Sequence, residues 1–165
     1  MKIIYHYAAF LYLTFMLSTA AVAQTPDKAF KNMKWRPVGP ANMGGRTTDI
    51  EGIPGDPSTF YIGGADGGVF KTTNGGVTMT SLFTDQRAYS IGDIAIAPSD
   101  HEVIWLGTGE GDPRNSVGYG YGVYRSNDAG KTWQHMGLEK TDRIKRIIVD
   151  PTNPDAACVC AMGRE

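Results

Sequence analysis

One short motif occurs twice in this sequence, and the repeat constrains the fold more than any other feature. The second copy runs from Ser126 to Trp133 and follows the pattern S-x-D-x-G-x-T-W. The first copy runs from Thr72 to Met79, with Asn74 where the second copy has its aspartate. Each copy lies between short runs of β-branched and aromatic residues, which predicts a β-hairpin. A repeated hairpin motif indicates a repeat architecture.

The residue types of the motif suit a tight turn. A hydroxyl and a carboxylate or amide can bond the backbone N–H groups of their own turn, and glycine adopts conformations that a side chain obstructs. We expect the tryptophan to cover its hairpin with apolar surface, and Met79 to make the first corner pack less rigidly. Catalysis or metal binding by Asp128 is the alternative. The predicted structural positions are Thr72, Asn74, Gly76, Ser126, Asp128, Gly130, Thr132 and Trp133.

A second repeat sets the size of the unit. Turns rich in Pro, Asp and Asn begin at Pro54, Pro98 and Pro151, and each is followed by a β-branched or aromatic run. Together with the stretch before each turn and the hairpin after it, one unit holds four short strands, as in a β-propeller blade. The predicted fold is all-β and antiparallel, with an incomplete ring. Complete blades are expected at about 46–84 and 90–137, and half of a third blade at about 143–162.

The N-terminus is typical of a secretory signal. A positive start at Lys2, an apolar run and an A-x-A-type site ending at Ala23 predict a signal peptide at 1–23, a linker at 24–34 and a partial propeller at 35–165. A membrane anchor is the alternative, but spanning a bilayer takes about 20 apolar residues. We expect export to the periplasm, cell surface or medium, with no membrane attachment after cleavage. Exposed strand edges predict self-association if the chain is a fragment expressed alone.

Composition narrows the choice of partner. The net charge is −1, and Lys and Arg are scattered among Asp and Glu, so nucleic acid is not an expected partner. His101 and His135 have no ligand neighbour at a suitable spacing, so we expect no metal and no cofactor. Cys158 and Cys160 share one face of a predicted strand, which does not favour a bond between them. We expect both to be small buried residues.

A family resemblance follows from several segments. The stretch from Trp35 to Ile50 resembles the opening of large exported bacterial BNR/Asp-box propeller proteins, which are related to the sortilin-type propeller and often labelled glycosyl hydrolase-like. The segments 68–73, 90–100 and 107–110 continue the resemblance, which covers nearly all of the chain after Trp35. It implies an exported propeller of many blades, so the downstream blades of the same polypeptide are expected partners.

Candidate binding residues lie in two loops. Propellers bind ligands where the loops between second and third strands gather, and here these loops are 63–68 and 107–121. Aromatic faces can stack on a ligand, and carboxylates can accept its hydrogen bonds. A solvated turn for the first loop and packing between blades for the second are the alternatives. The second loop carries Glu110, Asp112, Arg114, Asn115, Tyr119 and Tyr121.

Asp66 is the catalytic candidate, and only through a resemblance. Around the first blade the chain is similar to the xyloglucan-hydrolysing propeller glycosidases, in which an early Asp-x-Gly-Gly turn carries one of two catalytic carboxylates. The resemblance implies this role for Asp66, although no residue separates it from Gly67 and Gly68. Glycoside hydrolysis needs a second carboxylate across the scissile bond, and a later blade would have to supply it.

Two functions are therefore carried forward. The first is a protein- or glycan-binding scaffold without catalysis of its own, with the ligand at the mouth of the propeller channel. The alternative is the N-terminal part of a propeller glycoside hydrolase acting on polysaccharide. A structural assembly factor, like the photosystem-associated propellers, also fits the motif.

Overall fold

The computed structural model describes residues 46–112 and 115–163. The predictions for 1–23, 24–34 and Arg114 lie outside the described residues. The described residues all belong to one unit of the chain, Pro37–Glu165. They form ten strands and no helix, which confirms the all-β prediction.

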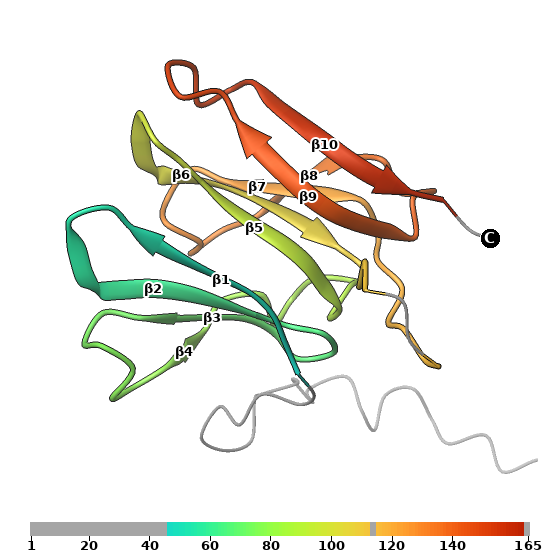
Figure 1. Cartoon of the computed structure of the whole chain (residues 1–165), viewed down its shortest axis with the longest axis horizontal. Coiled ribbons are helices and arrows are strands. Elements are labelled where there is room, and N and C mark those ends of the chain that lie inside the picture. Colours follow the sequence, from blue (N-terminus) through green and yellow to red (C-terminus); the bar gives the residue numbers. More distant parts are fainter. Residues whose placement is uncertain (1–45, 113–114, 164–165) are drawn as a thin grey trace, which may run out of the picture. The chain divides into compact units, whose positions relative to one another are not determined.

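The ten strands form three antiparallel sheets, in each of which sequential strands are neighbours (Figure 1). Two sheets have four strands and the third has two, as predicted, and the described sheets do not close into a ring. The first sheet contains β1 (Thr47–Ile53), β2 (Asp56–Gly64), β3 (Gly68–Thr72) and β4 (Thr80–Ser81); the second contains β5 (Ile91–Ala97), β6 (Asp100–Thr108), β7 (Val123–Ser126) and β8 (Gln134–Gly137); the third contains β9 (Arg143–Val149) and β10 (Ala157–Met162).

The turn between the first and second strands of each sheet uses the same local chemistry. The Asp56 carboxylate accepts a hydrogen bond from the backbone N–H of Ser58 at 2.9 Å, and Asp100 accepts one from Glu102 at 3.0 Å. In the third sheet the side-chain oxygen of Asn153 accepts the N–H two residues on, also at 3.0 Å. A short polar side chain that bonds the backbone two residues later stabilises a turn, so these hairpins are specified locally.

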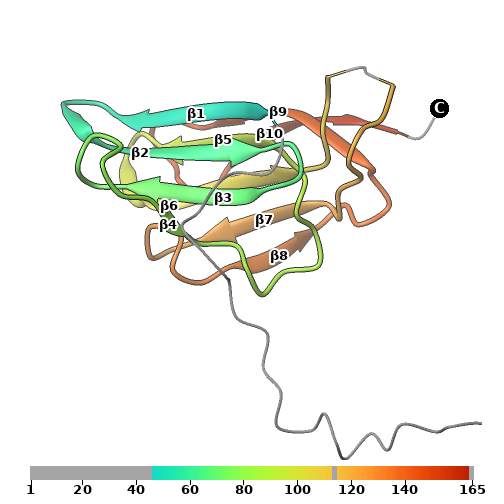
Figure 2. The same cartoon turned by 90° about the horizontal axis from the view of Figure 1, so that it is seen from below.

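The sheets pack against one another through two apolar clusters, and β5 lies beside both β1 and β9 (Figure 2). Alternate residues of β5 serve different clusters, as the period of a strand requires. Between the first and second sheets lie Tyr61, Val69, Phe83, Ile91, Ile94, Ile96, Ile104, Leu106 and Tyr124. Between the second and third sheets lie Ala95, Ala97, Val103, Trp105, Val123, Ile144, Ile147 and Val149.

An aspartate carboxylate, partly buried at Asp49 and buried at Asp93, joins the first strand of each four-stranded sheet to the next sheet. Asp49 Oδ2 accepts the backbone N–H of Ile94 at 2.8 Å, and Asp93 Oδ2 accepts that of Ile147 at 2.6 Å. The two aspartates occupy equivalent positions in β1 and β5. In β9 the equivalent position is Arg146, whose guanidinium lies 3.5 Å from Asp93 Oδ1. The sheets are therefore held in register by polar contacts as well as by apolar packing.

Trp133 does more than cover its own hairpin. Its ring approaches Gly130 of its own turn, as expected. It also reaches the preceding sheet, where Nε1 donates to Leu82 O at 3.0 Å and the ring packs edge-on against Phe83 at 5.4 Å. The tryptophan is therefore also a contact between sheets.

The prediction for the cysteines was half wrong. Cys158 and Cys160 are free thiols, as expected, but both are exposed instead of buried. They lie on the face of β10 turned away from the second sheet, and no other described sheet covers that face. Strand alternation was thus predicted correctly, whereas burial depends on what packs outside the sheet.

Candidate functional site

The candidate site lies at the end of the sheets where the loops between second and third strands gather. Thr47 pairs with Gly64 and Ile91 pairs with Thr108, so the starts of β1 and β5 lie beside the loops 65–67 and 109–122. We call this end the loop end. The motif turns 72–79 and 126–133 follow β3 and β7, so they lie at the opposite end, the turn end.

The loop 109–122 is closed at its base by a hydroxyl. Thr108 Oγ1 donates to Gly122 O at 2.6 Å and accepts the backbone N–H of Tyr121 at 2.7 Å. Further out, the N–H of Glu110 donates to Gly118 O at 3.0 Å. These bonds join the described parts of the loop, 109–112 and 115–122, to each other and to β6.

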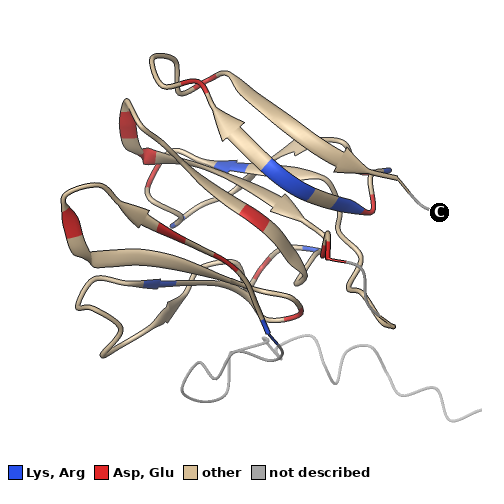
Figure 3. Cartoon of the chain, viewed as in Figure 1, with Lys and Arg blue, Asp and Glu red and all other residues tan. Residues whose placement is uncertain are grey.

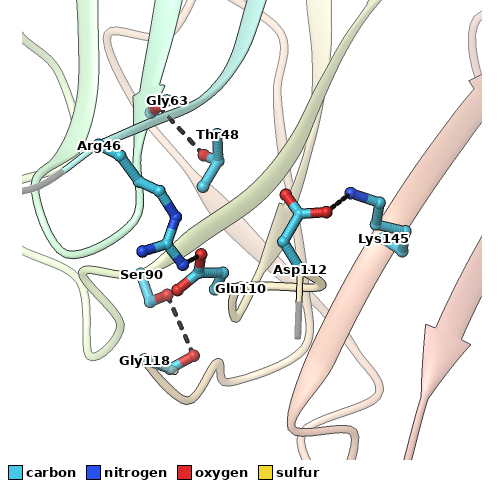
Figure 4. Close-up of polar contacts among 8 residues, drawn as sticks. All are labelled: Arg46, Thr48, Gly63, Ser90, Glu110, Asp112, Gly118 and Lys145. Atoms are coloured by element: carbon cyan, nitrogen blue, oxygen red, sulfur yellow. Dashed lines mark hydrogen bonds and ion pairs between the residues drawn. The ribbon is translucent and has the colours of Figure 1, made fainter. Parts of the chain in front are cut away.

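A buried ion pair attaches this loop to the first sheet. Arg46, directly before β1, pairs with Glu110, whose side chain is 1% exposed (Figure 4). Ser90, directly before β5, donates through Oγ to Gly118 O at 3.1 Å. A buried carboxylate needs a charged or hydrogen-bonding partner, because removing it from water is costly. The loop position therefore depends on Arg46.

The same loop also contacts the third sheet. Asp112 pairs with Lys145 of β9, and both side chains are about half exposed (Figure 4). The backbone N–H of Gly120 donates to Asp142 O at 2.7 Å. The loop thus bridges the loop ends of all three described sheets.

Three exposed residues lie at the Ser90–Gly118 contact or next to it in the chain. A Cβ atom at Gly118 would collide with Asp66 Oδ1 and Ser90 Oγ, which places the exposed Asp66 carboxylate against the loop. Tyr119 follows Gly118 and is 60% exposed, and Tyr89 precedes Ser90 and is 56% exposed. The carbonyl of Tyr89 accepts the N–H of Gly68, beside the Asp66 turn, at 2.8 Å. The loop end therefore has an exposed carboxylate at the Ser90–Gly118 contact and two exposed tyrosines next to it in the chain.

The other predicted binding residues have different environments. Asn115 is exposed on the loop, whereas Glu110 is buried against Arg46. Tyr121 is stacked on His135 at 5.1 Å between ring centroids, and its hydroxyl accepts a hydrogen bond from Arg87 at 2.9 Å. Asp66, Tyr119 and Asn115 are therefore exposed, whereas Glu110 is buried and Tyr121 stacks on His135.

Two residues of the site, Arg46 and Tyr89, were not predicted from the sequence. Arg46 precedes β1, and Tyr89 lies two residues before β5. The repeat contained a usable signal, because residues just before a first strand must lie at the loop end of their sheet. Nothing local indicated that Arg46 would pair with a loop of the next sheet.

The first strands carry an uneven distribution of charge. Acidic residues lie on β1 and β5, and basic residues on β9 (Figure 3). Burial, with a smaller contribution from the nearby Asp49, raises the pKa of Asp93 to about 6, against the lowering effects of the hydrogen bond from Ile147 and of Arg146 and Lys145. Burial, and then Asp49, also raise the pKa of Glu51. These carboxyls are therefore less acidic than ordinary ones.

The described residues contain no group of His, Cys, Asp and Glu arranged to hold a metal ion. They also contain no helix that could cross a membrane. Phenol rings can stack on the apolar faces of sugar rings, and a carboxylate can accept hydrogen bonds from hydroxyl groups.

Comparison with known proteins supports the fold. No protein-family model and no curated protein matches this sequence. Among solved structures, an ancestral GH74 enzyme is similar over 78% of this chain, with a TM-score of 0.60 and 20% sequence identity. A GH74 enzyme of Niastella koreensis is similar over 61% of the chain, with a TM-score of 0.47 and 20% identity. GH74 enzymes are β-propeller-type glycoside hydrolases, and the first similarity identifies the sheets as propeller blades. The chain spans 15% of the length of each of these structures.

Proposed function

We propose that this chain is a segment of an exported β-propeller that binds a glycan at the loop end, without catalysis of its own. The observation that carries the proposal is that the loop end has an exposed carboxylate, Asp66, against the Ser90–Gly118 contact, and that the residues next to Ser90 and Gly118 in the chain, Tyr89 and Tyr119, are both exposed. An exposed aromatic ring offers a ligand an apolar face, and an exposed carboxylate offers hydrogen-bond acceptors.

The supporting structure favours binding because it is preorganised. The Arg46–Glu110 pair and the Lys145–Asp112 pair hold the loop 109–122 from both sides. Side chains that are already held in place by such contacts lose little conformational entropy when a ligand arrives. The carbohydrate class fits the surface because a sugar ring offers both an apolar face and hydroxyl groups. The GH74 similarity is consistent with this ligand class but concerns the fold.

The test is a titration of the full chain with soluble β-glucan oligosaccharides by isothermal calorimetry. Tyr119→Ala and Tyr89→Ala should each weaken binding about three- to ten-fold, the range expected for loss of one aromatic contact. The matched control is Val77→Ala, because Val77 is 82% exposed but lies at the turn end. Binding that is equally insensitive to all three substitutions would show that the loop end is not the site.

A glycoside hydrolase is the second candidate, and one observation favours it. Asp66 is exposed in an Ala-Asp-Gly-Gly turn at the loop end, on blades similar to those of a GH74 enzyme. Among the described residues, the other carboxylates of the loop, Glu110 and Asp112, are already held by Arg46 and Lys145. The second acid would therefore come from elsewhere in the whole protein. Release of reducing ends from β-glucan that Asp66→Asn abolishes would replace the binding proposal with this one.

A further inference from the structure

The two motif turns differ at a pair of residues that can react with each other. In the first turn Asn74 is followed by Gly75. The second turn has Asp128 followed by Ala129. In an Asn-Gly pair the backbone nitrogen of the glycine can attack the side-chain amide carbon of the asparagine, because no side chain obstructs the approach. Asn74 and Gly75 are both exposed, and a Cβ atom added at Gly75 would meet nothing within 4 Å.

The folded turn engages both reacting groups in hydrogen bonds. Asn74 Oδ1 accepts the Thr72 hydroxyl at 3.0 Å and the Thr78 N–H at 2.9 Å, and Nδ2 donates to Thr78 Oγ1 at 2.9 Å. The Gly75 N–H donates to Ser58 O of β2 at 2.9 Å. The attack needs this nitrogen without its proton and the amide carbon turned onto it, so these bonds must first break. The reaction therefore requires the turn 72–79 to open.

The first turn is anchored less firmly than the second. The strand that follows Met79, β4, has two residues. The second turn has an equivalent backbone bond, from the Ala129 N–H to Glu102 O at 2.9 Å, and Trp133 also ties it to Leu82 of the first sheet. Segments with few buried contacts open locally at a lower cost in free energy than unfolding of the whole domain. The Asn-Gly pair thus lies in the turn that opens more readily.

We propose that Asn74 is a site of self-deamidation, controlled by local opening of the turn 72–79. The Gly75 nitrogen gives its proton to water or base and forms a bond to Asn74 Cγ. The Cγ–Nδ2 bond breaks, and the nitrogen takes up a proton and leaves as ammonia. Water then adds to either carbonyl of the cyclic imide, which gives aspartate or isoaspartate. The net reaction consumes water, releases ammonia and transfers no electrons.

The two products have opposite consequences for the turn. Aspartate is the residue of the second turn, where Asp128 accepts both the backbone N–H and the hydroxyl of Thr132. The aspartate product therefore re-forms the first turn, with the Thr78 hydroxyl as a donor. Isoaspartate adds a carbon atom to the backbone, which disrupts the spacing of the bond from the Gly76 N–H to Thr72 Oγ1. The reaction thus either restores the turn or dismantles it.

The first test follows the reaction in the full chain, at mildly alkaline pH in water enriched in the heavy isotope of oxygen. Peptide mapping by mass spectrometry should find heavy oxygen at position 74, as a mixture of aspartate and isoaspartate. A synthetic peptide of residues 70–80 is too short to fold alone, so it should react about ten- to a hundred-fold faster than the full chain. Equal rates in chain and peptide, or no product in the chain after about a hundred peptide half-lives, would overturn the proposal.

Gly75→Ala is the matched control for the chemistry. Ala129 occupies the equivalent position of the second turn with a similar positive φ, 55° against 67° at Gly75, so the turn accepts an alanine there. The added methyl group obstructs the attack, and the variant should react about ten-fold more slowly in both chain and peptide. An unchanged rate in the peptide would mean that the Gly75 nitrogen is not the attacking group, and the proposal would fail.

A graft tests whether anchoring controls the rate. The double variant Asp128→Asn/Ala129→Gly places the same pair in the second turn, so that one molecule contains both sites. The grafted site should react about ten-fold more slowly than Asn74, because Trp133 ties its turn to the first sheet. Equal rates at the two sites would overturn the proposal.

Two further variants separate local opening from unfolding of the whole chain. Met79→Ala loosens the first turn and should speed the reaction at Asn74 about five-fold. Arg46→Ala destabilises the loop end, far from the turn along each strand, and should leave the rate unchanged. Acceleration by Arg46→Ala as large as that by Met79→Ala would mean that the pair reacts only after global unfolding, which would overturn the proposal.

Discussion

The two motif turns, 72–79 and 126–133, make nearly the same hydrogen bonds. In each, the hydroxyl of the first residue accepts the backbone N–H four residues on, from Gly76 to Thr72 at 2.9 Å and from Gly130 to Ser126 at 2.8 Å. The side-chain oxygen of the third residue accepts the N–H of the seventh, at 2.9 Å in the first turn and 2.8 Å in the second. An asparagine therefore forms this turn as well as an aspartate does.

The hairpins differ in how they are anchored. Trp133 of the second turn reaches the first sheet and contacts Leu82 and Phe83. Met79 of the first turn is half-buried near Gly76, and the strand after it, β4, has two residues where β8 has four. The comparison teaches that the polar residues of the motif specify the turn, while its last residue decides how firmly the hairpin joins a neighbouring sheet.

The two loops at the loop end also differ in how they are anchored to neighbouring sheets. The loop of the first sheet spans 65–67, whereas that of the second spans 109–122 and pairs with Arg46 on one side and Lys145 on the other. The second blade is thus attached to its neighbours at both ends. Four predictions test whether these attachments, and not the turns, dominate stability.

The largest effect is expected from Arg46→Ala. Glu110 is 1% exposed, so removing its partner leaves a buried charge, which should lower the free energy of unfolding by about 3 kcal/mol. Lys145→Ala breaks an exposed pair of the same loop and should cost below about 1 kcal/mol. Urea denaturation of both variants measures the contrast. Equal losses would mean that the loop is held equally from both sides.

The second prediction compares the stability that Trp133 and Met79 contribute as the last residues of the two motif turns. Trp133→Ala should lower the free energy of unfolding by about 2 kcal/mol, since Trp133 is partly buried and the change removes a large aromatic contact and a hydrogen bond between sheets. Met79→Ala should cost about 1 kcal/mol because Met79 is half-buried and lies in the shorter hairpin. Thermal and urea denaturation should agree on this order. A larger loss at Met79 would refute the stronger anchoring of the second hairpin.

The third prediction compares pH 4.5 with pH 7.5 at the contact between the second and third sheets. The pKa of Asp93 is raised to about 6, so its contribution to stability is full below about pH 4 and is lost as the pH rises through 6. Asp93→Asn keeps an acceptor for the Ile147 N–H but does not titrate. From pH 4.5 to pH 7.5, the free energy of unfolding of Asp93→Asn should therefore rise relative to that of the wild type by on the order of 2 kcal/mol.

Asp93→Ala is the control for this experiment. It removes the acceptor of the Ile147 N–H, so it should be less stable than Asp93→Asn at both pH values. The titrating groups that face Asp93 are Asp49 of β1 and Lys145 and Arg146 of β9. If the free energies of unfolding of the wild type and of Asp93→Asn change in parallel with pH, the pH dependence comes from groups other than Asp93.

Much of the fold was predictable because its signals are local. Turn residues such as Asp56 and Asp100 bond the backbone two residues on, and the motif turns bond within themselves, so sequence position alone indicates the hairpins. Repetition of these signals specified the blades. The exposed carboxylate at Asp66 was likewise predictable, since a Gly-rich turn between strands must lie at the surface.

The parts that could not be predicted depend on contacts distant in sequence. Arg46 and Glu110 are 64 residues apart in the chain and lie in different blades, and neither belongs to a pattern that pairs them. The exposure of Cys158 depends on what covers the outer face of β10, which strand alternation cannot specify. Nothing in the sequence distinguishes Tyr89 from other residues of its connecting segment. Only the fold brings that segment close to Gly118.

The smallest expected effect concerns the motif turns. It measures how much stability the Asp128 carboxylate of the second turn contributes compared with the Asn74 amide of the first. Burial acts to raise the pKa of Asp128, but the hydrogen bonds from Thr132 and Ser126 outweigh it and lower the pKa to about 2. A lowered pKa contributes stability that is present above about pH 4 and is lost as the pH falls through 2. Because the group lies near solvent, we expect about 1 kcal/mol after screening. Asp128→Asn reproduces the first turn, so its unfolding free energy should fall less than that of the wild type between pH 4.5 and pH 2. An Asn74→Asp variant should gain the same acid sensitivity in the first turn, and an unchanged acid profile in both variants would show that the two turns are equivalent in energy as well as in geometry.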